Sequence, residues 1–523
     1  MTDIVANKTL PIQWNETVNC YPDKIFMEYI TTTDEHFSYT YREFDEKVKK
    51  AANFFIDLGI QKGDFVALHL HNSPEYAYCW LALAHIGAIS VPQNEHYRIY
   101  ESSYAIAKCH SEYVIIEDRV VDVYDQTNPD AVHVKNTIII KDTVKAPHLI
   151  SLQEGMKDQP TTLKEERLIT VDDMAVILFT SGTTSRPKGA IYTHYNVVFG
   201  GLIHVAQMGM GHGDRFLTSM PCYHMDFQEM AITPCIVTGS TLIMIEHYSA
   251  RRFWKQIVDY KATITDTMSI MNRTMMLQPV QPWEKDHCVR HSYFSMGMSD
   301  EEKDAFEERF NVSLLNSYGS TESVSGVTCA PFYGEKNWPS VGRAAYCYEL
   351  KIIDSHGKEV PPNTVGEICI HGIPGKTIIS GYYNDHRATA KLIDKDNWMH
   401  TGDKGYIDEG GWLFFVDRSC NLIKVNGENV SSLEVECVLT SHEKIADAAV
   451  IGIPHPIYSQ EVKAFIQLAE GQSLTEDEIW EYCEANLSKF KVPSILVFVE
   501  DFPRTSTGKI QKQKLRNAEK QDN

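Results

Sequence analysis

A run of hydroxyl and glycine residues that ends in a lysine carries the clearest chemical signal of this sequence. It reads Thr-Ser-Gly-Thr-Thr-Ser-Arg-Pro-Lys-Gly over residues 180–189 and directly follows the hydrophobic segment 174–179. Small residues let backbone amides approach an anion closely, and Lys188 adds a positive charge, so the segment suits a phosphate group. It is not the G-x-x-x-x-G-K-[ST] motif, because Gly189 follows Lys188. A single loop of this composition is more often a polar surface loop.

Four further segments follow this loop and contain acids, a tyrosine and a lysine within short polar motifs. Together with 180–189 they resemble, in order, the motifs of the adenylate-forming superfamily, which includes acyl-CoA synthetases, luciferases and the adenylation domains of peptide synthetases. Five matches in the right order make coincidence very improbable. The four segments are Tyr318-Gly319-Ser320-Thr321-Glu322, Thr401-Gly402-Asp403, Asp417-Arg418 with Gly427-Glu428-Asn429, and Pro503-Arg504-Thr505-Ser506-Thr507-Gly508-Lys509.

The resemblance implies a two-step reaction. A carboxylate attacks the α-phosphate of ATP to give acyl-AMP and pyrophosphate, and the thiol of CoA then releases AMP. Because charge builds up on the reacting groups, charge stabilisation is the main catalytic task. The resemblance implies that Lys509 is the cation between the carboxylate and the α-phosphate, and that Glu322 binds Mg²⁺.

The remaining roles follow from the same resemblance. Tyr318 offers a flat face for adenine, and Asp403 and Arg418 reach the ribose hydroxyls. The implied catalytic residues are Lys509, Glu322, His224 and Thr184. The implied ATP site consists of Thr180, Ser181, Gly182, Thr183, Thr184, Lys188, Gly297, Tyr318, Gly319, Ser320, Thr321, Glu322, Asp403, Arg418 and Lys509. Taken singly, acids such as Glu322 and Asp403 also serve as caps or turn residues, and lysines in a charged tail usually face solvent.

The segment 221–226 resembles the stretch beside the acyl pocket in this superfamily, so Tyr223, His224 and Asp226 are the expected acyl-substrate residues. A lone histidine is as consistent with a core position. A carboxylate in an acyl pocket carries a desolvation penalty unless a cation pairs with it, and a trimethylammonium acid supplies that cation. Aromatic walls such as Tyr223, Phe227 or Trp254 suit the same group, although Asp226 could equally cap a helix.

Within the superfamily, segments such as 224–226, 248–251 and 302–306 resemble the bacterial crotonobetaine/carnitine CoA ligases. This resemblance implies crotonobetaine, carnitine or γ-butyrobetaine as the acid. Three alternatives stay open: a medium-chain or branched fatty-acid CoA ligase, a stand-alone adenylation enzyme that loads a carrier protein, and a nucleotide-binding regulator without activity. The joint presence of Lys509, Glu322, Asp403 and Arg418 favours an enzyme over the regulator.

Helical and strand-like patterns alternate along almost the whole chain, which predicts α/β layers with mostly parallel sheets. Helices are expected near 41–58, 73–86 and 193–208, and strands near 64–70, 88–92 and 174–179. We expect a large N-terminal multi-sheet α/β body over 1–416 and a small, mobile α+β lid over 417–523. The resemblance makes Asp417 the hinge and Gly427, Glu428 and Asn429 the loop presented to CoA.

The composition excludes several classes of protein. Among 523 residues, 49 Lys and Arg against 70 Asp and Glu give a net charge of −21, which argues against extended contact with nucleic acid. No secretory signal or membrane-spanning run is evident. The 12 cysteines are scattered without a Cys-x-x-Cys pair, so we expect reduced thiols and a cytoplasmic protein. The oligomeric state stays open.

Overall fold

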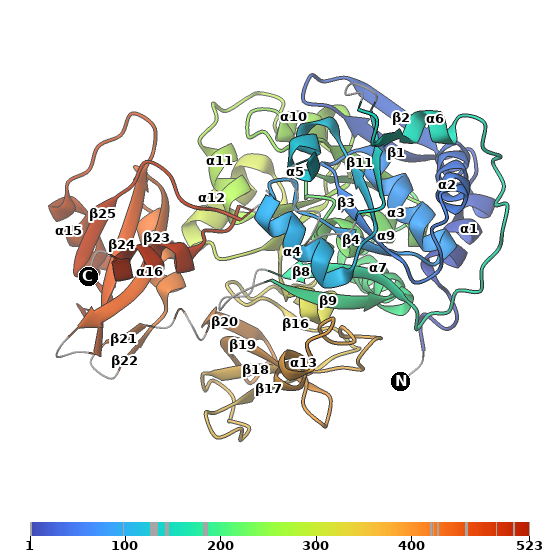
Figure 1. The fold of residues 1–523 in the computed structure, drawn as a ribbon. Coiled ribbons are helices and arrows are strands. Elements are labelled where there is room, and N and C mark those ends of the chain that lie inside the picture. Colours follow the sequence, from blue (N-terminus) through green and yellow to red (C-terminus); the bar gives the residue numbers. More distant parts are fainter. Residues whose placement is uncertain are drawn as a thin grey trace.

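A computed structural model gives the fold of the protein (Figure 1). It describes residues 3–521 except 98, 126–133, 142–145, 181–186, 419–420, 422, 426–427, 456–458, 488 and 506–507. The strands in these residues form four sheets. Two large sheets build the body, a third sheet lies below them in Figure 1, and the fourth belongs to the C-terminal region at the left.

The first large sheet carries the strand that precedes the phosphate-type loop. Its order is β7-β6-β5-β3-β4-β8-β9, and its neighbours run parallel except for the antiparallel pair β8–β9. Parallel strands covered by helices on both faces explain the nearly continuous hydrophobic runs. The strands are β3 (Phe65–His69), β4 (Ile89–Pro92), β5 (Tyr113–Ile116), β6 (Asn136–Ile139), β7 (Leu149–Ser151), β8 (Met174–Thr180) and β9 (Lys188–Thr193).

The second large sheet has the order β16-β15-β14-β13-β12-β10-β11-β1-β2. Its centre, from β14 to β1, is parallel, whereas the strands at both edges pair antiparallel. The strands are β1 (Ile25–Ile30), β2 (His36–Thr40), β10 (Arg215–Thr218), β11 (Thr241–Ile245), β12 (Ile264–Met268), β13 (His291–Ser295), β14 (Ser313–Gly319), β15 (Gly326–Cys329) and β16 (Arg343–Ala344).

The third sheet departs from the expectation of mostly parallel sheets, whereas the fourth lies in the region expected to form an α+β lid. The third sheet, β17-β18-β19-β20, is antiparallel throughout, and the fourth is antiparallel except for the pair β24–β25. Antiparallel neighbours need no crossover helix, although α13 (His386–Leu392) lies between β18 and β19 along the chain. The strands are β17 (Glu349–Ile353), β18 (Gly366–His371), β19 (Trp398–Ile407), β20 (Leu413–Arg418), β21 (Ile423–Val425), β22 (Glu428–Val430), β23 (Ile445–His455), β24 (Ser459–Leu468) and β25 (Ile495–Phe498).

Local signals explain where the helices begin and end. Thr40 caps α2 (Tyr41–Asp57) in a reciprocal pair with Glu43, and Gly87, at φ 71°, ends α3 (Pro74–Ile86). The three predicted helices are confirmed. The third of them is α7 (His194–Met208). The other helices are α1 (Leu10–Cys20), α4 (Ile99–Cys109), α5 (Val121–Asp125), α6 (Leu152–Met156), α8 (Met225–Phe227), α9 (Thr233–Thr238), α10 (Phe253–Asp259), α11 (Ser269–Met276), α12 (Asp300–Phe310), α13 (His386–Leu392), α14 (Ser432–Thr440), α15 (Glu476–Asn486) and α16 (Lys512–Gln521), with short helical turns η1 (Asp118–Val120), η2 (Gln228–Ile232), η3 (Thr321–Ser323) and η4 (Lys489–Lys491).

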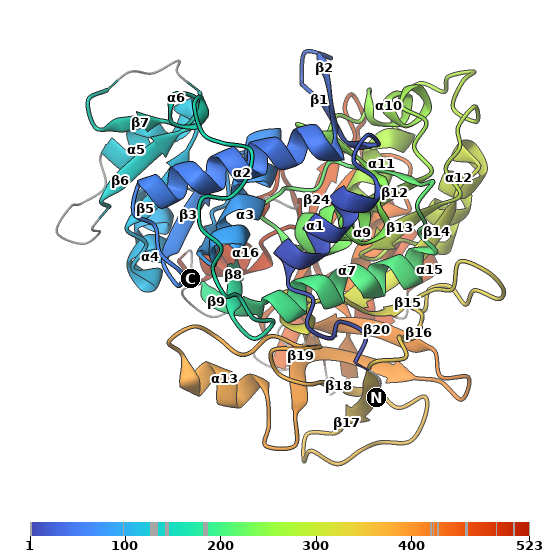
Figure 2. The ribbon, with the colours of Figure 1, turned by 90° about the vertical axis from the view of Figure 1, so that its right-hand side faces the viewer.

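The C-terminal sheet has a hydrophobic core of its own. Val430, Val435 and Val450 are among its buried side chains, and this cluster is separate from the large core of the body. Figure 2 shows α1, α2 and α7 on the side of the body that faces away from this sheet. The expected fold class is therefore confirmed. The predicted division after residue 416 falls inside β20 and stays a prediction.

Two composition-based expectations have structural counterparts. Every cysteine within the described ranges is a free thiol, and Cys420 lies outside them. We also find, among the described residues, no helix whose length and apolar character would let it cross a membrane.

Candidate functional site

The hairpin β8–β9 holds the two ends of the phosphate-type loop. Its last register pair joins Thr180 to Lys188 across the antiparallel ladder. The loop residues Ser181, Gly182, Thr183 and Thr184 lie outside the described residues. The predicted strand 174–179 is confirmed, and it brings both ends of the loop to one edge of the sheet.

Lys188 and Glu322 meet around Tyr382, a residue that the sequence analysis missed. The Tyr382 hydroxyl donates a hydrogen bond of 2.7 Å to Oε1 of Glu322, and Nζ of Lys188 lies 5.0 Å from the centre of the Tyr382 ring. Burial, together with the Glu322 charge, raises the pKa of Tyr382, so the phenol stays a donor. A backbone bridge from Ala190 fixes Tyr382 beside β9. Its sequence context contains no motif that signals this contact.

The turn that carries Glu322 is held from several sides. Ser320 caps η3, and the Tyr192 hydroxyl donates a hydrogen bond of 2.5 Å to the carbonyl of Thr321. A Cβ atom on Gly319 would lie 2.5 Å from the carbonyl oxygen of Ser325, so only glycine fits there. Glu322 itself is half-buried. One half-buried carboxylate beside a phosphate-type loop fits Mg²⁺, which proteins usually bind through one or two carboxylates and substrate phosphates.

Tyr318 and Asp403 come together from β14 and β19. The Tyr318 hydroxyl donates a hydrogen bond of 2.8 Å to Oδ2 of Asp403, and both residues are buried. In the third sheet, Asp403 is the register partner of Arg418, whose side chain lies outside the description. The structure therefore places three predicted nucleotide residues at one point between two sheets.

The predicted acyl residues begin at the N-terminus of α8. Nδ1 of His224 lies 3.1 Å from Oδ2 of Asp226, whose side chain is 24% exposed. Burial raises the pKa of Asp226, but the charges of His224 and Lys509 outweigh it and hold this pKa below its usual value. Lys509 is thus close enough to act on the carboxylate of Asp226. Tyr223 is buried next to them.

Trp254 does not form a wall of this site, which corrects one expectation. Its ring lies 4.3 Å from that of Phe310, and its indole N–H donates a hydrogen bond to the carbonyl of Glu284. Trp254 and Phe310 belong to the second hydrophobic core of the body. Phe227 is fully buried, with an edge-on contact to Tyr76 at 6.4 Å.

The predicted hinge residue binds the first helix of the C-terminal region. Oδ2 of Asp417 accepts a hydrogen bond of 2.6 Å from the Ser432 hydroxyl, at the start of α14. The next residue, Leu433, lies against Gly297 of the body, where an added Cβ would come within 2.7 Å of the leucine side chain. Glu428 and Asn429 are in β22 but their side chains lie outside the description, as does Gly427 entirely.

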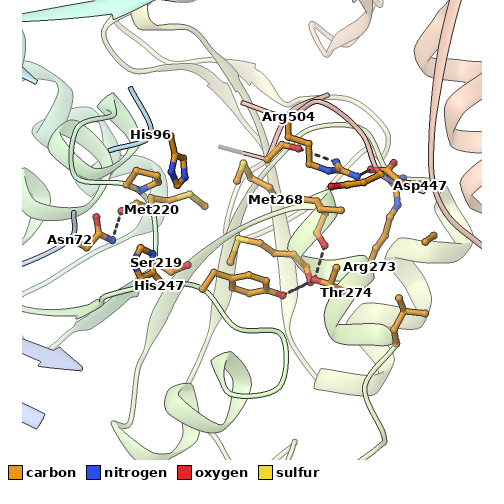
Figure 3. Close-up of a pocket in the computed structure, with 18 of the residues that line it drawn as sticks. Asn72, His96, Ser219, Met220, His247, Met268, Arg273, Thr274, Asp447 and Arg504 are labelled. Atoms are coloured by element: carbon orange, nitrogen blue, oxygen red, sulfur yellow. Dashed lines mark hydrogen bonds and ion pairs between the residues drawn. The ribbon is translucent and has the colours of Figure 1, made fainter. Parts of the chain in front are cut away.

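A cavity of about 560 Å³ lies between the body and the C-terminal region (Figure 3). Pro221 lines it on the body side, three residues before His224, and Gly508 lines it on the other side, next to Lys509. Figure 3 shows Asn72 and Met220 on one wall and Arg504 with Asp447 on the opposite wall. The cavity therefore adjoins both the acyl-type segment and the lysine loop.

A chain of ion pairs joins the lysine loop to the body along this cavity. Arg504 donates hydrogen bonds of 2.6 Å to Asp447 and 3.1 Å to the carbonyl of Gly508. Nη1 of Arg273, on α11, lies 3.9 Å from Asp447, and its Nε donates to Glu302 at 2.6 Å. These linked ion pairs, which the sequence analysis missed, tie the position of Lys509 to the body.

Comparisons with known proteins agree with this geometry. A family model described as "AMP-binding enzyme" matches residues 14–383, and one described as "AMP-binding enzyme C-terminal domain" matches residues 434–509. A crotonobetaine/carnitine–CoA ligase of Proteus mirabilis is 42% identical over 520 residues, which cover 98% of this chain and 100% of the relative. A ligase of the same name from Escherichia coli is 42% identical over 516 residues, with the same coverage.

Solved structures show the same fold at low identity. An anthranilate CoA ligase in complex with anthranoyl-AMP has a TM-score of 0.91 and 23% identity, covering 100% of this chain and 99% of the other. An o-succinylbenzoate CoA synthetase of Bacillus subtilis, in complex with AMP, has a TM-score of 0.83 and 23% identity, covering 98% of each chain.

Proposed function

The chain belongs to the AMP-binding enzyme family and is an acid CoA ligase that uses ATP and CoA, and we propose that its acid is a small trimethylammonium carboxylate. γ-Butyrobetaine, crotonobetaine and carnitine are the candidates. The observation that carries the proposal is the 42% identity to crotonobetaine/carnitine–CoA ligases over 98% of this chain. The ionised Asp226 beside the lysine loop supports it, because its negative charge at the acyl-type segment favours a substrate that carries a positive group.

The proposed roles divide the site into a phosphate side and an acid side. Lys188 and the loop after Thr180 hold the phosphates of ATP, and Glu322 would hold Mg²⁺, which would supply positive charge to stabilise them. Tyr318 and Asp403 bind the nucleoside. Lys509 stabilises the charge that develops as the carboxylate attacks the α-phosphate, beside His224.

The second step requires a different arrangement of the C-terminal region. We propose that the region turns about Asp417, withdraws Lys509 and presents the loop with Gly427, Glu428 and Asn429 to CoA. A hinge closure of this kind needs two packings of similar energy. The present arrangement, with Lys509 acting on Asp226 and Arg273 near Asp447, supports adenylate formation.

Loss of the Arg273 link should slow the first step alone. We expect Arg273→Gln to lower the rate of adenylate formation about 3- to 10-fold, which corresponds to about 0.6 to 1.4 kcal/mol of partly buried ion pairing. The rate of thioester formation from preformed acyl-adenylate should stay unchanged. Single-turnover assays of the two half-reactions give the ratio of the rate of adenylate formation to the rate of thioester formation.

Two variants serve as controls for that experiment. Glu302→Gln removes the ion pair that Arg273 forms within the body but keeps the contact between Arg273 and Asp447. Arg309→Gln breaks a comparable buried pair with Glu284 that lies within the body. Both should leave the ratio of the two rates unchanged. An equal loss in both half-reactions of Arg273→Gln would contradict the link.

The substrate proposal is tested by CoA-dependent release of AMP across a panel of acids. We expect γ-butyrobetaine, crotonobetaine and carnitine to give kcat/KM at least about 10-fold above crotonate, hexanoate and octanoate, because the latter acids offer the acidic pocket no positive group to attract. Preference for octanoate would reassign the substrate to fatty acids. AMP release that needs a carrier protein instead of CoA would contradict the CoA ligase.

A further inference from the structure

Glu229 is a buried carboxyl group three residues beyond Asp226. It lies on η2, a π-helical turn that continues α8 and leads into α9. Such turns are often found at functional sites. Residues three apart on a helix lie on the same face, so Glu229 shares the face of Asp226. In the sequence, the only signal for Glu229 is a second acid placed three residues after Asp226.

The surroundings give the Glu229 carboxylate no partner. Its side chain is fully buried, and neither carboxylate oxygen has a hydrogen-bond partner among the described residues. Room for it comes from α7, where a Cβ on Gly200 would lie 2.8 Å from Cγ of Glu229. A buried carboxyl without a partner is costly, and it persists where a ligand supplies the missing charge.

The neighbours of Glu229 are uncharged apart from Asp226. Burial raises the pKa values of Tyr76 on α3 and Tyr192 on β9, and burial lowers the pKa of His204 on α7 to about 4. These three groups are therefore neutral. Asp226 is paired with His224 at 3.1 Å, which leaves Glu229 as the acid that lacks a counter-charge.

We propose that Glu229 is the counter-ion of the substrate's trimethylammonium group and thereby sets the preference for quaternary acids. The inference rests on the proposed function and names the group that produces its specificity. A trimethylammonium group offers charge but no hydrogen-bond donor, so it suits a carboxylate that has no directed partner. With the substrate carboxylate beside His224 and Lys509, the cationic end of a short acid extends along the face that carries Asp226 and then Glu229.

Ionisation of Glu229 accompanies binding in this account. Burial, reinforced by the charge of Asp226, raises the pKa of Glu229 well above its usual value and favours the neutral acid. A bound cation reverses that preference, so the group releases its proton to solvent. Affinity for the quaternary acid should therefore rise with pH relative to an uncharged analogue.

The test compares γ-butyrobetaine with its carbon isostere, in which a tert-butyl group replaces the trimethylammonium group. In Glu229→Gln we expect kcat/KM for γ-butyrobetaine to fall at least about 10-fold, mainly through KM, while the isostere is used as well as before or better. Glu229→Asp keeps the charge and should retain part of the preference. Asp226→Asn, which removes an already paired charge, should cost the quaternary acid less than Glu229→Gln.

Asp266 on β12 supplies the matched control. It is also buried, burial raises its pKa to about 8, and it accepts a hydrogen bond of 3.0 Å from Thr218. Asp266→Asn should leave the preference for γ-butyrobetaine unchanged. Thermal unfolding of each variant confirms that the proteins compared are folded.

A measurement on the unmodified enzyme avoids dependence on any variant's fold. Calorimetry in buffers of different ionisation enthalpy should show net proton release with γ-butyrobetaine and none with the isostere, and Asp266→Asn should keep this release. Absence of release in the wild-type enzyme, or a Glu229→Gln enzyme that keeps the wild-type preference, would overturn the role of Glu229 alone. A wild-type enzyme that uses both acids equally would contradict the proposed function as well.

Discussion

Lys509→Ala should slow adenylate formation about 10²- to 10³-fold while thioester formation from preformed acyl-adenylate survives. A β-bridge between Arg504 and Ile510 closes the loop that holds Lys509. The backbone amide of Lys509 donates a hydrogen bond of 3.0 Å to the Thr505 hydroxyl. Gly508 lies against Ile270 of the body, with an added Cβ 3.2 Å from that side chain. Loss of a pre-positioned charge at a developing charge costs about 10²- to 10³-fold in rate. Pyrophosphate exchange into ATP measures the first step.

The lysine at 514 provides the control for this variant. Lys514 is exposed on α16, a few residues further along the same basic tail. Lys514→Ala should leave both half-reactions at the wild-type rate. If Lys509→Ala slowed both half-reactions equally, the account of a lid that withdraws the lysine would be wrong.

The second large effect is expected from Glu322→Gln. The variant keeps the shape of the side chain and removes the charge that we assign to Mg²⁺. We expect adenylate formation to fall about 10²- to 10³-fold and more Mg²⁺ to be needed for half-maximal rate. Titration of Mg²⁺ at saturating ATP measures both quantities.

Tyr382→Phe separates the charge of Glu322 from its hydrogen bond. It removes the 2.7 Å bond but leaves the carboxylate. One such bond contributes about 1 kcal/mol, so we expect a loss within about 10-fold and an unchanged Mg²⁺ requirement. A Glu322→Gln enzyme with the wild-type Mg²⁺ dependence would remove Glu322 from the metal site.

Local signals made the helices and several strands predictable. The helix over residues 41–57 begins at Thr40 with its partner Glu43, and the helix that ends at Ile86 is stopped by Gly87. Strand pairing is different, because it joins residues far apart in the chain. The parallel pair β1–β11 joins Met27 to Leu242, and no local pattern specifies such a partner. The antiparallel third sheet escaped prediction for the same reason.

In the site, residues within motifs could be predicted, whereas residues that matter through their contacts could not. Tyr318 and Asp403 were identified through their motifs, and the structure joins them by a hydrogen bond. Tyr382 and Arg273 lie outside the motifs, and their importance follows from contacts made only in the folded chain. Trp254 was misplaced because an aromatic residue serves a core as well as a pocket.

The central claim is that this enzyme activates a trimethylammonium acid through an adenylate. The most direct test of this claim uses γ-butyrobetaine labelled with oxygen-18 in the carboxylate, together with ATP, Mg²⁺ and CoA. The carboxylate oxygen that attacks the α-phosphate stays on phosphorus when CoA displaces AMP. The account therefore predicts AMP that carries one labelled oxygen for each acyl-CoA formed. Acyl-CoA formed together with unlabelled AMP would contradict it.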